Sequence, residues 1–222
     1  MSSYRARQPG ASLARILFYE LIRKSAHLIL AVFFGARAID RRNVPAVGPL
    51  LLASNHESYL DPPVIASLMN HRHLEFIARA GLFKFRPFAS IIALLNSIPI
   101  REDQGDGAAI REVLRRLDMG RAVLIFPEGS RSPDGTMQPF KRGVSLLVKR
   151  SKCPVVPVAI AGAHECWPRH RWPRLFGPPI IVKYGVPIPH DELMKDGPDA
   201  ALERLFNEIK GLRDGLHVNG RE

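Results

Sequence analysis

Six short apolar runs, separated by segments of helical character, constrain the fold of this chain most strongly. Such runs, several of them rich in β-branched residues, are typical of buried strands. Strands that alternate with helices predict an α/β fold: a central, mostly parallel or mixed sheet of about six or seven strands, flanked by helices. The expected strands are 50–53, 74–78, 97–100, 122–126, 155–160 and 180–184. Pro157 predicts that the fifth run lies at a sheet edge or carries a bulge, because proline cannot donate a ladder hydrogen bond.

Helical patterns fill the segments between these runs. Apolar residues recur every three or four positions in 106–119 and 200–212, as in helices with one buried face. We also expect helices at 13–36 and 62–69 and one that begins near Lys141. The apolar segment 82–95 predicts a helical hairpin, either part of an acyl groove or plain core. The 222 residues therefore predict an N-terminal helical segment, 1–40, followed by one α/β domain, 41–222.

The N-terminal helix is amphipathic. Glu20, Arg23, Lys24 and His27 share one narrow face, and nearly all other residues of 13–36 are apolar. A wide apolar face with basic residues at its edge predicts a helix that lies in a membrane interface. Its uninterrupted apolar run, 28–34, is too short to span a bilayer. Two alternatives stay open: the helix packs on the protein's own core, or the segment is a signal peptide.

A polar turn, Asn55 to Asp61, follows the first apolar run and precedes Pro62-Pro63. Asp is favoured as a helix N-cap and proline just after it, so the turn joins a strand to a helix. It places His56 and Asp61 at the carboxyl end of a strand, where open α/β sheets bind ligands. A histidine held by a carboxylate serves as a general base near neutral pH. An ordinary hydrogen-bonded surface histidine is the alternative.

A second polar loop, Pro127 to Ser132, follows the apolar run 122–126. Gly129 permits close approach of the backbone, Ser130 supplies a hydroxyl, and Arg131 supplies a guanidinium that can bind two phosphate oxygens. Together these residues predict a phosphate site, with a plain surface turn as the alternative.

Other chemistries lack their sequence motifs. The chain has no Gly-rich dinucleotide fingerprint, Walker loop, Gly-x-Ser-x-Gly or zinc spacing. Cys153 and Cys166 make no disulfide framework, which favours a reducing compartment. The formal charge of +11 favours anionic partners, but aromatic residues are not interleaved with the basic ones as in nucleic-acid-binding modules. We therefore expect no metal, no cofactor and no nucleic-acid partner.

In this order and spacing, the motifs resemble the glycerolipid acyltransferase family, which includes 1-acylglycerol-3-phosphate acyltransferase. The resemblance covers roughly residues 40–190. Segment 55–61 is similar to the family's first block with its His-x4-Asp pair, 126–132 to its third and 155–158 to its fourth. The second block departs from the family pattern, because Arg101 stands one position before the expected arginine and Glu102 takes that place.

The resemblance implies transfer of a fatty acyl group from acyl-CoA or acyl carrier protein to the free hydroxyl of a lysolipid. The implied acceptor is 1-acylglycerol-3-phosphate, and the product is phosphatidic acid. His56 would take the hydroxyl proton and Asp61 would orient the imidazole. The implied acceptor-binding residues are Glu128, Gly129, Ser130, Arg131, Arg101 and Lys141.

An enzyme of this kind is expected on the cytoplasmic face of the cell membrane, as a peripheral or monotopic protein. Its partners would be an anionic membrane surface, the lysolipid acceptor and the acyl donor. Two alternatives stay open. The acceptor could be another lipid, such as lyso-ornithine lipid or another lysophospholipid, or the chain could be a non-catalytic lipid-binding protein on the same scaffold.

Overall fold

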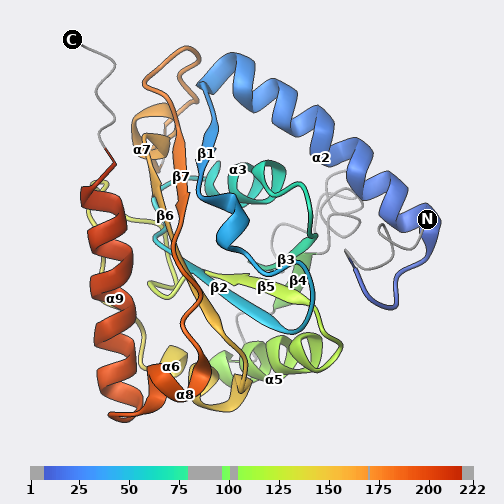
Figure 1. Ribbon diagram of the computed structural model, residues 1–222. Helices are drawn as coiled ribbons and strands as arrows, with labels where there is room; N and C mark the ends of the chain where they lie inside the picture. The colour runs from blue at the N-terminus through green and yellow to red at the C-terminus, as the bar shows by residue number, and fades with distance from the viewer. Residues whose placement is uncertain (1–7, 80–96, 101–104, 170, 217–222) are drawn as a thin grey trace.

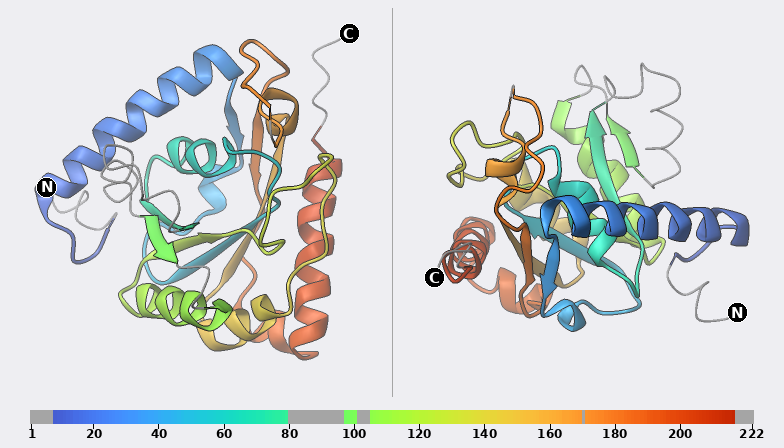
Figure 2. Two further views of the ribbon diagram at one scale, coloured as in Figure 1. Left: turned by 180° about the vertical axis from the view of Figure 1, so that it is seen from behind. Right: turned by 90° about the horizontal axis from the view of Figure 1, so that it is seen from above.

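The computed structural model describes residues 8–79, 97–100, 105–169 and 171–216. A seven-stranded sheet with the order β1-β7-β6-β2-β5-β3-β4 forms its centre, and helices cover both faces (Figures 1 and 2). The strands are β1 (Arg37–Ile39), β2 (Leu50–Ser54), β3 (Leu74–Arg79), β4 (Ser97–Ile100), β5 (Ala122–Ile125), β6 (Val155–Ala161) and β7 (Ile181–Tyr184). The helices are α2 (Leu13–Phe34), η1 (Arg41–Asn43), α3 (Asp61–Leu68), α5 (Gly105–Asp118), α6 (Gly143–Ser151), α7 (Ala163–Cys166), α8 (His190–Met194) and α9 (Pro198–Asp214).

The sheet is mixed and mostly parallel. All its strand pairs are parallel except β6 with β7. This confirms the predicted α/β class. Strand β1 was not predicted, because it is only three residues long and both its ends are exposed. It pairs with β7 at one edge of the sheet.

The prediction that Pro157 marks a sheet edge is wrong. Its strand, β6, lies inside the sheet between β7 and β2. The Pro157 carbonyl accepts the N–H of Gly185 at 2.8 Å, just past the end of β7. Proline has no N–H to donate, but at this position the pairing of β6 with β7 has already ended. A side chain at Gly185 would collide with the Pro157 ring, with only 2.8 Å between a Cβ and the ring Cγ. Glycine therefore makes room for the proline.

Alternate residues of the central strands point into two separate cores. Leu50 and Leu52 pack with α3 and the end of α2, whereas Leu51 and Ala53 pack with α5, α6 and α9. A strand buried on both faces reads as a continuous apolar run, which is why these strands were recognisable in the sequence. The carboxyl ends of β2 and β5 lie side by side and carry the two polar loops.

Helix α2 begins and ends at recognisable caps. The Ser12 hydroxyl accepts the N–H of Arg15, and Gly35 ends the helix in a left-handed conformation with φ of 56°. The helix stops two residues before its predicted end, because the left-handed Gly35 directs the chain into β1. Within the described part of the chain, none of the helices combines the length and hydrophobicity needed to cross a bilayer.

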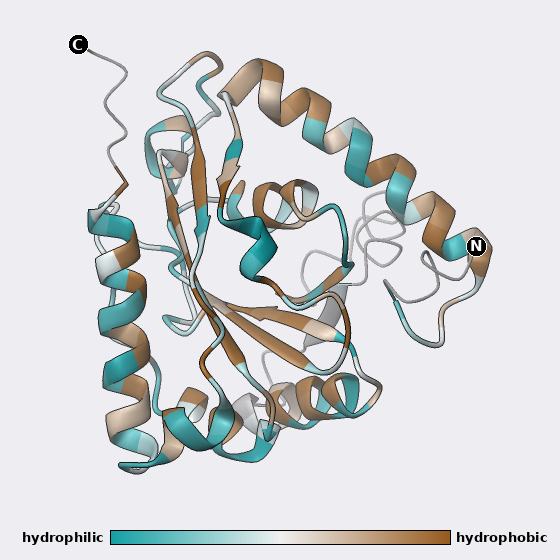
Figure 3. Cartoon of the chain, viewed as in Figure 1, coloured by the Kyte–Doolittle hydropathy of each residue, from teal (hydrophilic) through white to brown (hydrophobic). Residues whose placement is uncertain are grey.

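The polar face of α2 is divided between the protein and the solvent. Glu20 and Arg23 point inward and are buried; they pair with each other at 2.9 Å. Glu20 also bonds His73 at 2.9 Å, and Arg23 donates to the Ser67 carbonyl at 3.0 Å. This polar contact docks the helix on the domain, while Lys24, at the outer edge of the charged face, and the residues of the opposite side stay exposed. That opposite side is largely apolar (Figure 3).

Candidate active site

His56 and Asp61 face each other across the turn between β2 and α3. His56 Nδ1 lies 2.7 Å from Asp61 Oδ2. The same oxygen accepts the N–H groups of Glu57 and Ser58 at 2.7 and 2.8 Å. Asp61 is fully buried, and the imidazole is stacked on the Phe126 ring with centroids 4.0 Å apart. Nδ1 is therefore held in place, and Nε2 is the ring nitrogen that can act on a substrate.

The prediction that Asp61 is the N-cap of the following helix is wrong. Helix α3 begins at Asp61 itself, and Leu60 occupies the cap position without a side-chain hydrogen bond. The carboxylate instead bonds backward into the turn, where three donors meet one of its oxygens. Its negative charge still lies in the first turn of α3, where the helix dipole favours an anion.

Further hydrogen bonds attach the turn to the neighbouring strand β6. The Asn55 amide donates to the Ile160 carbonyl and accepts the Ile160 N–H, both at 2.9 Å. The Ser58 hydroxyl donates to the carbonyl of Trp167 at 2.8 Å. Asn55 carries no functional signal in the sequence, although it stands directly before His56. Its two bonds fix the start of the turn against the sheet.

Glu128 holds the catalytic turn against the loop that follows β5. One carboxylate oxygen accepts the N–H of His56 at 2.8 Å, and the other accepts the N–H of Gln138 at 3.0 Å. Burial raises the pKa of Glu128 to about 7, although both backbone donors act in the opposite direction. In return, Ser132 donates its N–H to the His56 carbonyl at 2.8 Å. Both Glu128 oxygens are thus engaged with the backbone, a geometry that the sequence did not reveal.

Gly129 and Lys141 are in close contact beside this carboxylate. Gly129 has φ of 71°, a left-handed conformation that favours glycine, and a Cβ at this position would lie 2.3 Å from Lys141 Cε. The lysine backbone is also fixed, because its N–H donates to the Pro127 carbonyl at 2.9 Å. Glycine therefore lets the Lys141 side chain cross the loop. The neighbouring Ser130 is exposed.

Arg131 lies over the aromatic ring of Tyr59, a residue of the catalytic turn. Its guanidinium carbon is 3.4 Å from the ring centroid, a cation–π contact. Tyr59 in turn contacts the Trp167 ring, with centroids 5.4 Å apart. Arg131 Nη1 is buried and has no hydrogen-bond partner among the described residues. A buried guanidinium nitrogen without an acceptor suits an anionic oxygen supplied by a ligand.

The structure brings His56, Asp61, Glu128, Gly129, Arg131 and Lys141 together around the ends of β2 and β5. Arg101 and the apolar hairpin predicted at 82–95 lie outside the described residues. Tyr59 was missed as a support for the arginine because a tyrosine in a turn gives no local signal of a stacking partner 72 positions away.

Known proteins resemble this chain in sequence and in structure. A 1-acyl-sn-glycerol-3-phosphate acyltransferase from Bacillus subtilis is 23% identical, over 89% of this chain and 98% of its own. The chloroplastic 1-acyl-sn-glycerol-3-phosphate acyltransferase BAT2 from Brassica napus is 25% identical over 69% of this chain. The chain spans about half the length of this plant relative (47%).

A crystal structure shares the fold. It is that of the 1-acyl-sn-glycerophosphate (LPA) acyltransferase PlsC from Thermotoga maritima, which superposes with a TM-score of 0.72 at 26% identity. The match covers 88% of this chain and 76% of that one. The Acyltransferase family itself matches residues 36–161, a range that contains both polar loops and most of the sheet. From this match, together with the geometry of the two loops, it follows that the chain belongs to the Acyltransferase family.

Proposed function

We propose that this chain transfers a fatty acyl group from a thioester, acyl-CoA or acyl carrier protein, to the free hydroxyl of 1-acylglycerol-3-phosphate, which gives phosphatidic acid. The observation that carries the proposal is the pairing of His56 and Asp61 on the same turn as Tyr59, which holds Arg131. The base for the acceptor hydroxyl, His56, and the cation for its phosphate, Arg131, are then both attached to the catalytic turn. The names of the relatives support the choice of acceptor.

The proposed reaction is direct attack. His56 Nε2 removes the proton of the acceptor hydroxyl while its oxygen attacks the thioester carbonyl. The carbon–oxygen ester bond forms as the carbon–sulfur bond breaks, and the proton passes from the imidazolium to the departing thiolate. Asp61 keeps the ring in the required tautomer and stabilises the transient cation. Because a thiolate is a good leaving group, no covalent intermediate on the protein is needed.

Arg131 is the proposed ligand of the acceptor phosphate, through Nη1, which has no hydrogen-bond partner in the described part of the chain. Lys141 lies beside Gly129 on the same loop and supplies a second positive charge. The Ser130 hydroxyl is exposed on this loop and is proposed as a further donor. Arg101, outside the described residues, stays a sequence-based proposal for the same role.

An anionic membrane surface is the proposed partner, with residues 1–40 as the segment that meets it and the cytoplasmic face as the location. Leu17, Leu21, Leu28 and Val32 on α2 are each more than half exposed, at 54–65%. At the end of this helix, Phe176 contacts Phe33 and is itself 72% exposed. Such an apolar stripe, with a lysine on it, suits the interface of an anionic bilayer.

A panel of acceptors tests the proposed reaction. Purified protein is incubated with labelled acyl-CoA or acyl carrier protein and with lysophosphatidic acid, other lysophospholipids or lyso-ornithine lipid. The expected result is fastest transfer to lysophosphatidic acid, with the His56→Ala variant as the blank. Transfer only to a phosphate-free acceptor would contradict the proposed phosphate site, and binding of lipid without any transfer would favour the non-catalytic alternative.

A further inference from the structure

The last turn of α9 reaches the catalytic turn through Arg213. Its Nη2 lies 3.2 Å from Oε2 of Glu57, the residue that follows the base, and it also donates to the carbonyl of Gly135. Glu57 is only 2% exposed, and its other oxygen accepts the N–H groups of Ala163 and His164 at 3.2 and 3.4 Å. One buried carboxylate thus connects the catalytic turn, α7 and α9.

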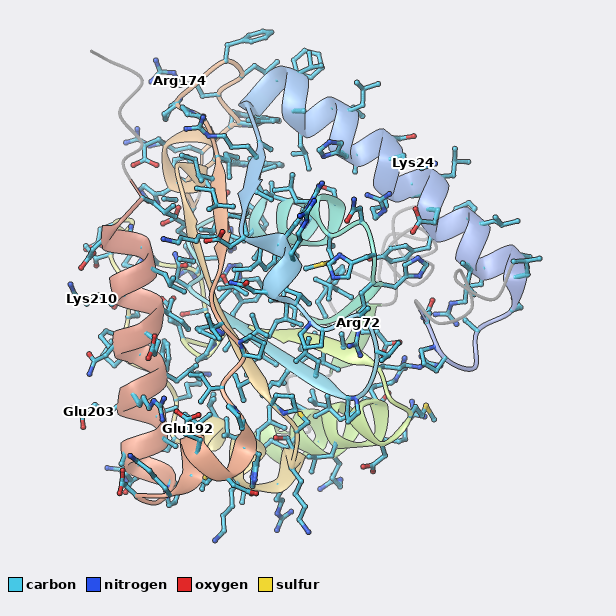
Figure 4. All side chains as sticks on the ribbon, viewed as in Figure 1. Lys24, Arg72, Arg174, Glu192, Glu203 and Lys210 are labelled. Carbon is cyan, nitrogen blue, oxygen red and sulfur yellow. The ribbon has the colours of Figure 1, made fainter. Side chains whose placement is uncertain are left out.

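This pair differs from the other ion pairs of the same helix. Lys210 pairs with Asp214, and both side chains are more than half exposed. Figure 4 shows Lys210 on the outer side of α9. In the pair of Arg213 with Glu57, the carboxylate side chain is 2% exposed and the guanidinium side chain 27%. Exposed pairs contribute little, whereas removal of one partner from a buried pair leaves the other group either charged without compensation or forced into its neutral form. The position of the Glu57 carboxylate therefore depends on Arg213.

We propose that Arg213 is a positioning residue for the acyl transfer. Its contacts with Glu57 and Gly135 fix His56 relative to the loop that carries Arg131. This inference rests on the proposed function. Glu128 already holds the same loop at Gln138, and Arg213 adds a second attachment at Gly135. Arg213 lies outside the segment matched by the family, 36–161, so that match gives it no role.

The charge state of Glu57 supplies a signature for this role. Ala163, His164 and Arg213 all donate hydrogen bonds to the Glu57 oxygens, so the ionised carboxylate is the form that accepts all three. Burial, Asp61 on α3 and Glu165 on α7 raise the pKa of Glu57 to about 8, whereas Arg213 and the His164 N–H act in the opposite direction. Loss of Arg213 therefore raises this pKa further and keeps the carboxyl protonated up to a higher pH.

Kinetics of three variants test the proposal. Arg213→Ala is expected to lower kcat about tenfold or more, equivalent to a rise of ~1.4 kcal/mol in the barrier, with the acceptor KM changed by less than about twofold. Arg213→Lys keeps the charge but replaces the planar guanidinium, whose Nη2 donates both bonds, by a differently shaped ammonium, so an intermediate loss is expected. Lys210→Ala, on the same helix and in an exposed pair, is the matched control and should behave as wild type.

A pH profile separates positioning from a general loss of stability. In Arg213→Ala the acidic limb of kcat should move to higher pH, because the pKa of Glu57 rises. The double variant Arg213→Ala with Glu57→Gln lacks the Glu57 carboxyl, so the move of the acidic limb to higher pH should disappear. The other ionisable side chains close to Glu57, namely those of His56, Asp61, His164 and Glu165, are the same in both variants. An unshifted limb in Arg213→Ala would overturn the inference.

Hydrogen exchange gives a readout that needs no substrate. Arg213→Ala should speed amide exchange in 55–61 and 131–138 relative to Lys210→Ala, with little change outside these segments, α7 and the last turn of α9. Acceleration spread over the whole protein, or none in these two segments, would overturn the positioning role. A wild-type protein that transfers no acyl group would defeat the proposed function, and the exchange result would still decide whether Arg213 holds the turn.

Discussion

At the scale of single residues, one carboxylate oxygen organises the catalytic turn. Asp61 Oδ2 accepts three hydrogen bonds, one from His56 and two from backbone N–H groups. The sequence predicted the pairing of His56 with Asp61, because both residues stand in a short turn with a fixed spacing. It did not predict the function of the Glu128 side chain, since its partners, His56 and Gln138, are brought together by the fold.

Replacing the proposed base should abolish most turnover. His56→Ala is expected to lower kcat at least ~100-fold, the range typical for loss of a general base. Steady-state kinetics with lysophosphatidic acid measure this, with thermal unfolding as a check that the variant is folded. His190→Ala, remote in sequence from both polar loops, is the control. Retained turnover in His56→Ala would remove this residue from the chemistry.

Replacing Arg131 should act mainly on the acceptor. Arg131→Ala is expected to raise the acceptor KM by tenfold or more with a smaller effect on kcat, because a phosphate is bound in both the ground state and the transition state. Arg131→Lys should recover only part of the loss. It keeps the positive charge, but an ammonium cannot bind two phosphate oxygens side by side and stacks less well on Tyr59. A fall in kcat at unchanged KM would contradict the assigned phosphate contact.

Glu128 should make stability depend on pH. Its pKa is raised from 4.5 to about 7 in the folded protein. Between these values the folded state keeps a proton that the unfolded state has released, so the free energy of unfolding falls as pH rises. Glu128→Gln should flatten this decline in urea unfolding between about pH 4.5 and 7. Glu203→Gln, exposed on α9 (Figure 4), is the control, and an equal slope in both variants would contradict the argument.

At the scale of elements, long periodic segments were predictable and short ones were not. Helices α5 and α9 follow their apolar periodicity to within two residues at each end. Helices α7 and α8 have only four and five residues, too few for a period to emerge, and were missed. The charged face of α2 was recognised, but its inward half was not, because its partner His73 comes from a distant segment.

The outer stripe of α2 should control binding to lipid. The double variant Leu21→Asn with Leu28→Asn removes two side chains that are 62% and 65% exposed, so it should leave the fold intact and weaken sedimentation with anionic vesicles at least tenfold. Val47→Asn with Val186→Asn is the matched control, at apolar loop positions that are 65% and 71% exposed. Equal binding by the two double variants would argue against α2 as the contact.

At the scale of the whole molecule, the formal charge of +11 is expected to add a long-range attraction to the proposed apolar contact with an anionic membrane. Salt should separate the two contributions, because the Debye length falls from about 10 Å at 0.1 M to about 3 Å at 1 M. Wild-type binding to anionic vesicles should weaken strongly over this range, and binding to neutral vesicles should change little. A salt-independent affinity for anionic vesicles would mean that charge takes no part.

The pairing of β1 with β7 has a consequence for how the chain is made. Arg37 lies opposite Ile181, so β1 meets its one neighbour among the described strands only after the chain has been made as far as β7. Contacts between residues so far apart close slowly. Until then, the carboxyl end of α2 lacks its bond to Ile180, and its apolar stripe is tethered to a nascent chain. A growing polypeptide is thus expected to meet the bilayer before its edge strand has docked.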